Sequence, residues 1–298
     1  MPLLQRGVVR TIEVLTGQPE LARLYRDYQR NGAAREDFWS GAVRRLGLVV
    51  NADLDRLARE LPATGPVVVV ANHPYGVLDG IVIGWLVRRV REDFRILTHA
   101  VLYKAPEVRP WLLPVDFSGT LEARRTNLAS RRSAHELLET GGVVVVFPAG
   151  AVSTSPDRMG RIPAVDAPWQ PFIAQLIQRH QAPVLPVYFA GQNSQLFQIA
   201  SHVSQTLRLS LLFKEVHDRM GTPIDVRIGE RLAASELDGL PSRQAVVDRL
   251  RVLTYGLGGL DGARAEPRTL GLAIKRKIDV KTILKRRRRS IEVAPPGP

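Results

Sequence analysis

Short runs of apolar, mostly β-branched residues recur along the chain with no alternation of polar positions. The first, Val67–Ala71, directly follows Pro66. A strand without polar positions is buried on both faces, as in a parallel or mixed sheet at the centre of a domain. The same pattern predicts further strands at Phe94–Thr98, Val143–Phe147, Val184–Phe189 and Ile224–Ile228.

Helical periodicity fills the intervals between these strands. Apolar positions recur every three to four residues, which predicts helices at Leu78–Val90, Leu121–Glu139, Pro171–His180, Leu207–Arg219 and Arg243–Tyr255. Strands that alternate with helices are typical of an α/β fold. Residues 61–257 are therefore expected to form a layered sandwich, with a central mixed, largely parallel sheet flanked by helices.

The two ends of the chain differ from this central part. Residues 1–60 show interrupted amphipathic patterns and are predicted to be a helical N-terminal segment. A glycine-rich stretch begins at Gly256, so residues 258–298 are predicted to be a flexible linker and a basic tail. Three parts are thus expected along the chain.

Composition excludes several classes of function. Hydrophobic residues make up 45% of the 298 residues and charged residues 24%, as in an ordinary globular protein. Cysteine is absent, which excludes disulfides, thiolate metal sites, iron–sulfur clusters and a cysteine nucleophile. Because no apolar stretch approaches the roughly 18 residues of a membrane span and Met1–Arg6 lacks a signal-peptide pattern, we expect a cytoplasmic protein.

Most of the net charge of +13 lies near the C-terminus, with nine basic residues and one acidic residue between Lys275 and Arg289. Such a run attracts a polyanion, either nucleic acid or the anionic inner face of the cell membrane. On a helix, Leu270, Ile274 and Ile278 would share one face, which favours peripheral membrane docking. The predicted membrane contacts are Lys285, Arg286, Arg287, Arg288 and Arg289.

The segment after the first strand, Asn72–Gly80, carries the first candidate site. His73 and Asp79 are six residues apart, about 240° around one helix, so they meet only if His73 stays in a loop and Asp79 begins a helix. Pro74 and Gly76 suit that turn. A carboxylate against one imidazole nitrogen would make His73 a general base toward a hydroxyl or amine. The alternative is that His73 only closes a strand and Asp79 only caps a helix.

Two later strands also end in distinctive turns. Pro148 and Gly150 would bend the backbone after Val143–Phe147 and could leave N–H groups facing an anion. Taken alone, this turn is an ordinary strand exit. Prolines at Pro183 and Pro186 suggest that the Val184–Phe189 strand is an edge or the wall of a pocket.

The order and spacing of these blocks resemble the glycerolipid and lysophospholipid acyltransferase family, and within it the bacterial hemolysin-like or lyso-ornithine-lipid-type acyltransferases. The resemblance extends from Thr11 to Glu230. Its blocks are Ile12–Gly17, Asn72-His73-Pro74 with Asp79, Phe147-Pro148-x-Gly150-x-x-Ser153, Pro183–Val187, Asn193–Phe197 and Leu207–Leu212.

This resemblance implies a glycerol-3-phosphate acyltransferase-like fold and a function in phospholipid biosynthesis. It implies transfer of a fatty acyl group from a thioester donor, acyl-CoA or acyl carrier protein, to a lysophospholipid or lyso-aminolipid. His73 would be the general base and Asp79 its orienting partner, and no cofactor is needed because the acceptor itself is the nucleophile. The implied substrate-binding residues are Asn72, Arg124 (or its neighbour Arg125), Asn127, Phe147, Pro148, Gly150 and Ser153.

Two departures from the family pattern bear on the substrate. Five residues separate His73 from Asp79 where the family has four, and we expect the turn to absorb the extra one. In the Phe147–Ser153 block, Ala149, Ala151 and Val152 stand where the family pattern has a Glu, a Thr and an Arg. Loss of that arginine disfavours a phosphate monoester, so a lyso-aminolipid acceptor is favoured over lysophosphatidate.

Two other functions are alternatives to the acyltransferase hypothesis. A non-catalytic, peripheral lipid-binding protein could keep the fold and use the basic tail for contact. Nucleic-acid binding would explain the tail, but no helix-turn-helix, zinc-finger or RNP signature is present, so no nucleic-acid partner is expected. The remaining histidines have no metal-ligand spacing, and no metal is expected.

Overall fold

A computed structural model describes residues 17–203 and 205–260. Its α-helices are α2 (Gln18–Asp27), α3 (Phe38–Arg45), α4 (Leu54–Glu60), α5 (Val77–Arg88), α6 (Leu121–Glu139), α7 (Phe172–His180), α8 (Gln195–Val203), α9 (Gln205–Asp218) and α10 (Arg243–Gly256). The strands are β1 (Val49–Asn51), β2 (Val67–Ala71), β3 (Phe94–His99), β4 (Leu112–Val115), β5 (Val143–Val146), β6 (Val184–Phe189) and β7 (Pro223–Ile228). Short π- or 3-10 turns are η1 (Tyr28–Gly32), η2 (Ala100–Lys104), η3 (Arg109–Trp111) and η4 (Ala234–Leu237).

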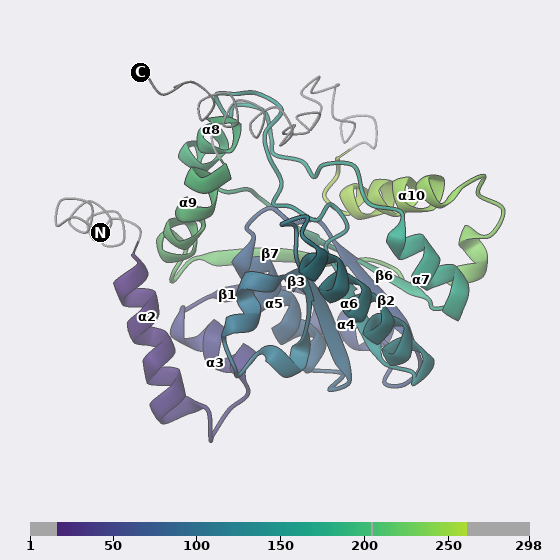
Figure 1. The fold of residues 1–298 in the computed structure, drawn as a ribbon, viewed down its shortest axis with the longest axis horizontal. Helices are drawn as coiled ribbons and strands as arrows, with labels where there is room; N and C mark the ends of the chain where they lie inside the picture. The colour runs from purple at the N-terminus through teal and green to yellow at the C-terminus, as the bar shows by residue number, and fades with distance from the viewer. Residues whose placement is uncertain (1–16, 204, 261–298) are drawn as a thin grey trace, which may run out of the picture. The chain divides into compact units, whose positions relative to one another are not determined.

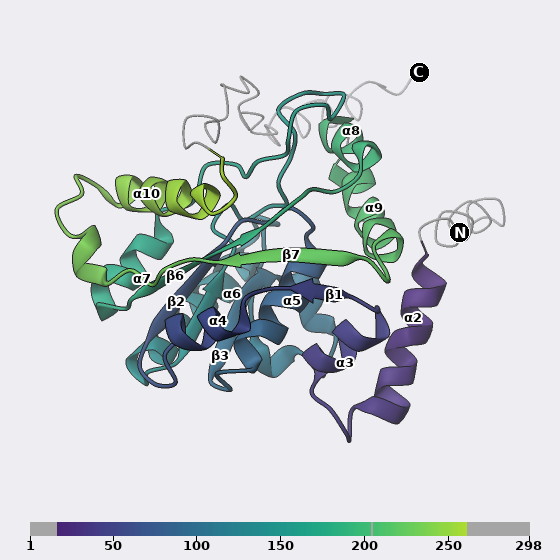
Figure 2. The same ribbon diagram turned by 180° about the vertical axis from the view of Figure 1, so that it is seen from behind.

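The strands form one seven-stranded sheet in the order β1-β7-β6-β2-β5-β3-β4 (Figure 1). Every neighbouring pair is parallel except β6 and β7, which are antiparallel. Seen from behind, β7 and β1 run side by side along one border of the sheet (Figure 2). The predicted mixed, largely parallel α/β fold is thereby confirmed.

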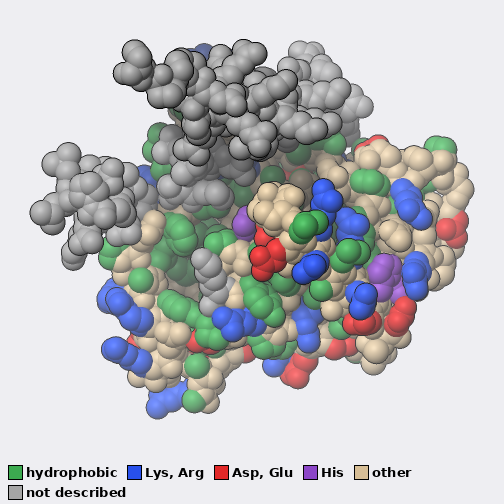
Figure 3. All heavy atoms as spheres, in the orientation of Figure 1, with side chains coloured by type: hydrophobic (Ala, Val, Ile, Leu, Met, Phe, Trp, Pro, Cys, Tyr) green, Lys and Arg blue, Asp and Glu red, His purple; other side chains and the backbone are tan. Residues whose placement is uncertain are grey.

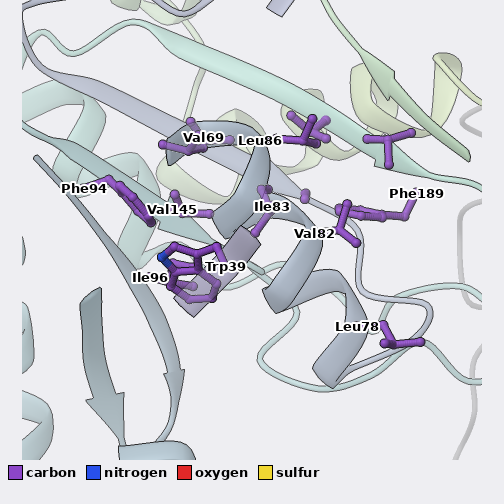
Figure 4. Close-up of a cluster of buried hydrophobic side chains, with 14 of the residues drawn as sticks. Trp39, Val69, Leu78, Val82, Ile83, Leu86, Phe94, Ile96, Val145 and Phe189 are labelled. Carbon is purple, nitrogen blue, oxygen red and sulfur yellow. The ribbon is translucent and has the colours of Figure 1, made fainter. Parts of the chain in front are cut away.

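Helices cover both faces of the sheet, because the central strands are apolar on both. On one face, Val67, Val69 and Ala71 of β2 pack with α3 and α5. Trp39 of α3 lies under α5 there, beside Ile83 and Ile96 (Figure 4). On the other face, Val68 and Val70 pack with α6, α7 and α10. Continuous valine runs therefore give the strands two buried faces.

The prolines suggested that β6 is an edge strand or the wall of a pocket. It is not an edge strand, because it lies inside the sheet between β2 and β7. Pro186 is tolerated there because the β6–β7 ladder begins one residue later, at Val187. The main-chain oxygen of Pro186 still accepts a 2.8 Å hydrogen bond from the N–H of Gly229. A proline is compatible with an internal strand when its missing N–H falls outside the ladder.

The N-terminal part is helical at α2, α3 and α4, and it also contributes β1 to the sheet. The division into residues 1–60, 61–257 and 258–298 stays a prediction. The predicted contacts Lys285 to Arg289 lie outside the described residues. Within residues 17–203 and 205–260, no helix is long and apolar enough to span a bilayer.

Candidate active site

Three neighbouring strands, β6, β2 and β5, end at the candidate site. Their order in the sheet places the loop after β2 between the loops after β6 and β5. The N–H of Ser153, in the β5 loop, donates a 2.8 Å hydrogen bond to the main-chain oxygen of His73. The two segments that the sequence singled out are therefore joined through their backbones, at the edge where α/β folds place their sites.

The expected proximity of His73 and Asp79 is confirmed. Nδ1 of His73 lies 3.0 Å from Oδ2 of Asp79, although the ring N–H is not aligned for a regular hydrogen bond. His73 stays in the loop, and Asp79 is the third residue of α5. Gly76 makes the turn with φ 76° and ψ −109°, a conformation that residues with a Cβ rarely adopt. The turn therefore absorbs the extra residue.

Asp79 also caps α5, as the alternative interpretation required. Its Oδ2 accepts hydrogen bonds from the main-chain N–H groups of Tyr75 (2.8 Å) and Gly76 (2.9 Å). The carboxyl group is fully buried, and burial raises its pKa, while His73 and the two N–H groups act in the opposite direction. Capping and contact with His73 are thus combined in one side chain.

Phe147 packs directly on the imidazole of His73. The two rings are stacked with centroids 4.1 Å apart. The side chain of His73 is 18% exposed, and Nδ1 is its enclosed nitrogen, which leaves Nε2 as the nitrogen available to a substrate. Gly150 turns with φ 67°, and its N–H bonds to the oxygen of Phe147. Pro148 accepts a bond from the N–H of Gln170.

Ser153 has its polar groups engaged within the protein. Its side chain is buried and donates a 2.5 Å hydrogen bond to Oδ1 of Asp166. The same oxygen accepts the main-chain N–H of His73 at 3.2 Å. Asp166 was not predicted as a site residue, because it stands alone in an irregular, proline-containing loop with no periodic pattern.

Asn72 joins two of the strand ends. Its Nδ2 donates to the oxygen of Phe189 at 2.9 Å, and its Oδ1 accepts the N–H of Phe189 at 2.7 Å. The side chain thereby extends the pairing of β2 with β6 by one step. This geometry favours a structural role over the predicted contact with substrate.

The two substrate-binding residues predicted on α6, Asn127 and Arg124, have different surroundings. Asn127 holds the preceding loop through two bonds to the main chain of Asp116, at 2.8 and 2.9 Å. That loop brings the exposed Phe117 within 3.8 Å of the position that a Cβ on Gly150 would occupy. Arg124 is exposed at the start of α6. Its predicted contact with an acceptor stays a prediction.

An arginine from another part of the chain contacts the segment Phe147–Ser153. Arg208 of α9 donates to the main-chain oxygen of Val152 and lies over the ring of Phe197. Burial lowers the pKa of this guanidinium. A guanidinium therefore approaches the turn where the family pattern has an arginine and this chain has Val152. Arg208 lies in the Leu207–Leu212 block of the resemblance, but its contact with Val152, 56 positions away, could not be predicted from the sequence.

Comparison with known proteins identifies the class. Residues 24–262 match the family model described as acyltransferase, which covers most of the chain, and the chain belongs to this acyltransferase family. The predicted assignment of the chain to an acyltransferase family, and to the enzymes that transfer acyl groups, is confirmed at this level.

Two relatives carry the same description, lyso-glycine lipid O-acyltransferase. The protein from Phocaeicola vulgatus is 26% identical over 208 residues, which are 68% of each chain. The protein from Bacteroides thetaiotaomicron is 27% identical over 153 residues, or 49% of this chain and 51% of the relative. Among solved structures, the 1-acyl-sn-glycerophosphate acyltransferase PlsC from Thermotoga maritima has a TM-score of 0.48 and 20% identity, covering 85% of this chain and 91% of its own.

Proposed function

We propose that this protein transfers a fatty acyl group from a thioester donor to a hydroxyl of a lyso-aminolipid, with His73 as general base and Asp79 as its orienting partner. The observation that carries the proposal is the 3.0 Å approach of His73 Nδ1 to the buried Asp79 carboxylate, in a chain of the acyltransferase family. A base held by a carboxylate is the element that acyl transfer to a hydroxyl requires.

The reaction follows from this arrangement. Nε2 of His73 takes the proton from the acceptor hydroxyl, and the hydroxyl oxygen attacks the carbonyl carbon of the thioester. The new C–O bond forms, the C–S bond breaks, and the thiolate leaves with the proton from the imidazolium. Asp79 stabilises the imidazolium by charge and keeps the ring in one orientation.

The acceptor is proposed from two observations. In the segment Phe147–Ser153, Ala149 and Val152 stand where the family pattern has a Glu and an Arg, so this charged pair is missing. Both curated relatives are described as acting on a lyso-glycine lipid. A lipid with an amino-acid head group and no phosphate monoester needs no bidentate arginine at this turn. A lyso-glycine lipid or a close analogue is therefore the first acceptor to test.

The donor and the location belong to the same proposal. Acyl-CoA and acyl carrier protein both present a thioester, and either fits the chemistry at His73. Exposed Phe117, beside Gly150, offers apolar surface for an acyl chain at the mouth of the site. We place the protein on the cytoplasmic face of an anionic membrane, where its lysolipid would reside.

A thiol-release assay tests the function. Purified protein would be mixed with palmitoyl-CoA or palmitoyl-acyl carrier protein and with either lyso-glycine lipid or lysophosphatidate. Because the chain has no cysteine, a thiol reagent reports only the product. We expect release with lyso-glycine lipid, a slower rate with lysophosphatidate, and an acylated lipid by mass spectrometry. No transfer with either donor and any acceptor would favour the non-catalytic lipid-binding alternative.

A further inference from the structure

A second buried carboxylate, that of Asp166, lies next to the main chain of His73. It belongs to the loop between β5 and α7, and its exposed fraction is 0%. Oδ1 accepts the hydroxyl of Ser153 at 2.5 Å and the main-chain N–H of His73 at 3.2 Å. Oδ2 accepts the indole N–H of Trp169 at 2.9 Å. One carboxylate therefore ties together the loops that follow β2 and β5.

The backbone of Asp166 is itself fixed from the other side. Its N–H donates a 2.7 Å bond to the hydroxyl oxygen of Tyr255, and its carbonyl oxygen accepts Nη2 of Arg251 at 2.9 Å. Both partners are buried residues of α10, which packs against the sheet. Held by a helix on one side and by three donors on the other, the carboxylate has little freedom to move.

We propose that Asp166 is a positioning residue for acyl transfer, which fixes the main chain of His73 and the Ser153 turn so that the imidazole meets both acceptor and thioester. The proposal rests on the function proposed above. Asp166 does not touch the reacting atoms, and it forms or breaks no bond in the reaction. Its second contribution is electrostatic, since its negative charge favours the imidazolium that forms when His73 takes the proton.

A carboxylate suits this position better than an amide. Three donors converge on two oxygens, whereas an asparagine offers one oxygen and turns its NH₂ toward a donor. Burial raises the pKa of Asp166, and the bonds from Ser153 and Trp169 and the charge of His73 act against it. The charged and titratable groups that face this cluster are His73, which itself contacts Asp79 of α5, and Arg251 from α10.

The test compares two substitutions of buried carboxyl groups in the full-length protein. Asp166→Asn keeps the size and removes the charge. Glu215→Gln is the matched control, because Glu215 is also buried and accepts the N–H and hydroxyl of Ser194, but it has no contact with His73. We expect Asp166→Asn to lower kcat by about 10²-fold with KM changed less than about threefold, since a shift of about 1 Å in a catalytic group costs this much. Glu215→Gln should lose thermal stability but keep kcat.

Each result decides the proposal. Normal kcat in folded Asp166→Asn protein would overturn it, as would an equal loss of kcat in Glu215→Gln. If Asp166→Asn does not fold, Trp169→Phe removes the indole N–H together with the five-membered ring, and Ser153→Ala removes only the hydroxyl. Both should then lower kcat at unchanged KM, and normal kcat in both would overturn the proposal. A wild-type protein that releases no thiol with any acceptor contradicts the proposed function instead.

Discussion

A buried carboxylate such as Asp79 is costly unless donors surround it, and here one oxygen meets all of them. Oδ2 faces the N–H groups of Tyr75 and Gly76 and Nδ1 of His73, whereas Oδ1 is buried without a partner. The side chain therefore uses only one acceptor position. An amide oxygen in that position could accept the same donors, but it would carry no charge.

This asymmetry gives the first prediction. Asp79→Asn should place its oxygen at the Oδ2 position, keep the helix cap, and leave the free energy of unfolding at neutral pH equal to or higher than that of the wild type. Turnover should nevertheless fall by roughly 10²- to 10⁴-fold, because the imidazolium loses its counter-charge. Steady-state kinetics and urea denaturation measure the two effects. Asp79→Ala, which also removes the cap, should lose about 1 kcal/mol or more of stability.

The second prediction concerns the base itself. His73→Ala should lower turnover by about 10²- to 10⁴-fold, the usual range for loss of a general base, with an unchanged circular dichroism spectrum. His217→Ala is the control, because His217 pairs with Glu20 of α2 at 3.1 Å. Wild-type turnover in His73→Ala protein would remove the histidine from the mechanism.

At the residue scale, the sequence predicted what depends on neighbouring positions. The meeting of His73 with Asp79 followed from a turn that Pro74 and Gly76 make possible. Asp166 could not be predicted, because its donors come from residues up to 93 positions away. Such convergence is set by how the strands are ordered in the sheet, and one sequence carries no pattern that reports it.

At the scale of elements, the contact of α3 with α5 depends on a glycine. A Cβ on Gly84 of α5 would lie 2.4 Å from the ring of Trp39, which is itself buried. Figure 4 shows the indole next to this helix, beside Ile83 and Ile96. Close packing of this kind tolerates no added volume unless the helix or the ring moves.

Two alanine substitutions in α5 should therefore have opposite effects. Gly84→Ala should lower the free energy of unfolding by about 1–3 kcal/mol, because overpacking outweighs the gain in helix propensity. Gly80→Ala, at a position with nothing within 4 Å of the new Cβ, should raise it by about 0.5–1 kcal/mol. Urea denaturation measures both, and a stabilised Gly84→Ala protein would contradict the packing argument.

A histidine pair links α6 to α7 and predicts a pH dependence. Nδ1 of His135 lies 2.7 Å from Nε2 of His180. Burial lowers the pKa of His135, and the charges of His180 and Arg179 lower it further; burial also lowers the pKa of His180. The folded state thus favours the neutral rings. Their contribution to stability is complete above the unfolded pKa of about 6.5 and is lost as the pH falls through the lower folded values.

Thermal unfolding checks this sign. The midpoint temperature of the wild type should fall between pH 7.5 and 5.5, and it should fall less in His135→Gln, where the substituted side chain does not titrate but can still bond His180. Equal decreases in the two proteins would show that other groups cause the acid sensitivity.

The sequence predicted the long elements well and missed the short ones. Helix α6 matches its predicted range, and the valine runs β2 and β5 differ by one residue at most. Strand β1 has three residues, too few for a pattern to register. Strand β4 contains Pro114, which interrupts a strand signal, and α8 begins after the polar run Gly191–Ser194. In these cases pairing with the sheet or packing against α9 stabilises an element that its own residues do not specify.

At the scale of the molecule, apolar and basic groups occur together near the site. The loop after Ser153 is tied to α8 by Gln195, which donates to the oxygen of Met159 at 2.6 Å. The loop and α8 expose four large apolar side chains, which we call the α8 surface: Met159 (47%), Ile162 (52%), Leu196 (52%) and Val203 (72%). Arg158 and Arg161 are exposed in the same loop. Basic side chains are also scattered among apolar ones on the face shown in Figure 3.

We expect this surface to meet an anionic membrane together with the basic tail. Apolar side chains flanked by arginines match the interface of such a membrane, and the net charge of +13 favours the approach. Docking through the α8 surface would bring the loop of Ser153, and with it His73, to the layer that holds a lysolipid.

Vesicle co-sedimentation separates the two contributions. A protein that ends at Gly262 lacks the tail and should bind anionic vesicles more weakly at low salt, since each cation near such a surface contributes on the order of 1 kcal/mol. The electrostatic share of the tail should disappear at 1 M salt, where the Debye length is about 3 Å, whereas binding through apolar side chains should persist. Met159→Ser with Leu196→Ser should remove that salt-resistant part, and the control Leu128→Ser, at an even more exposed apolar position on α6, should not. Equal low-salt binding by the full-length and truncated proteins would refute the role of the tail in docking.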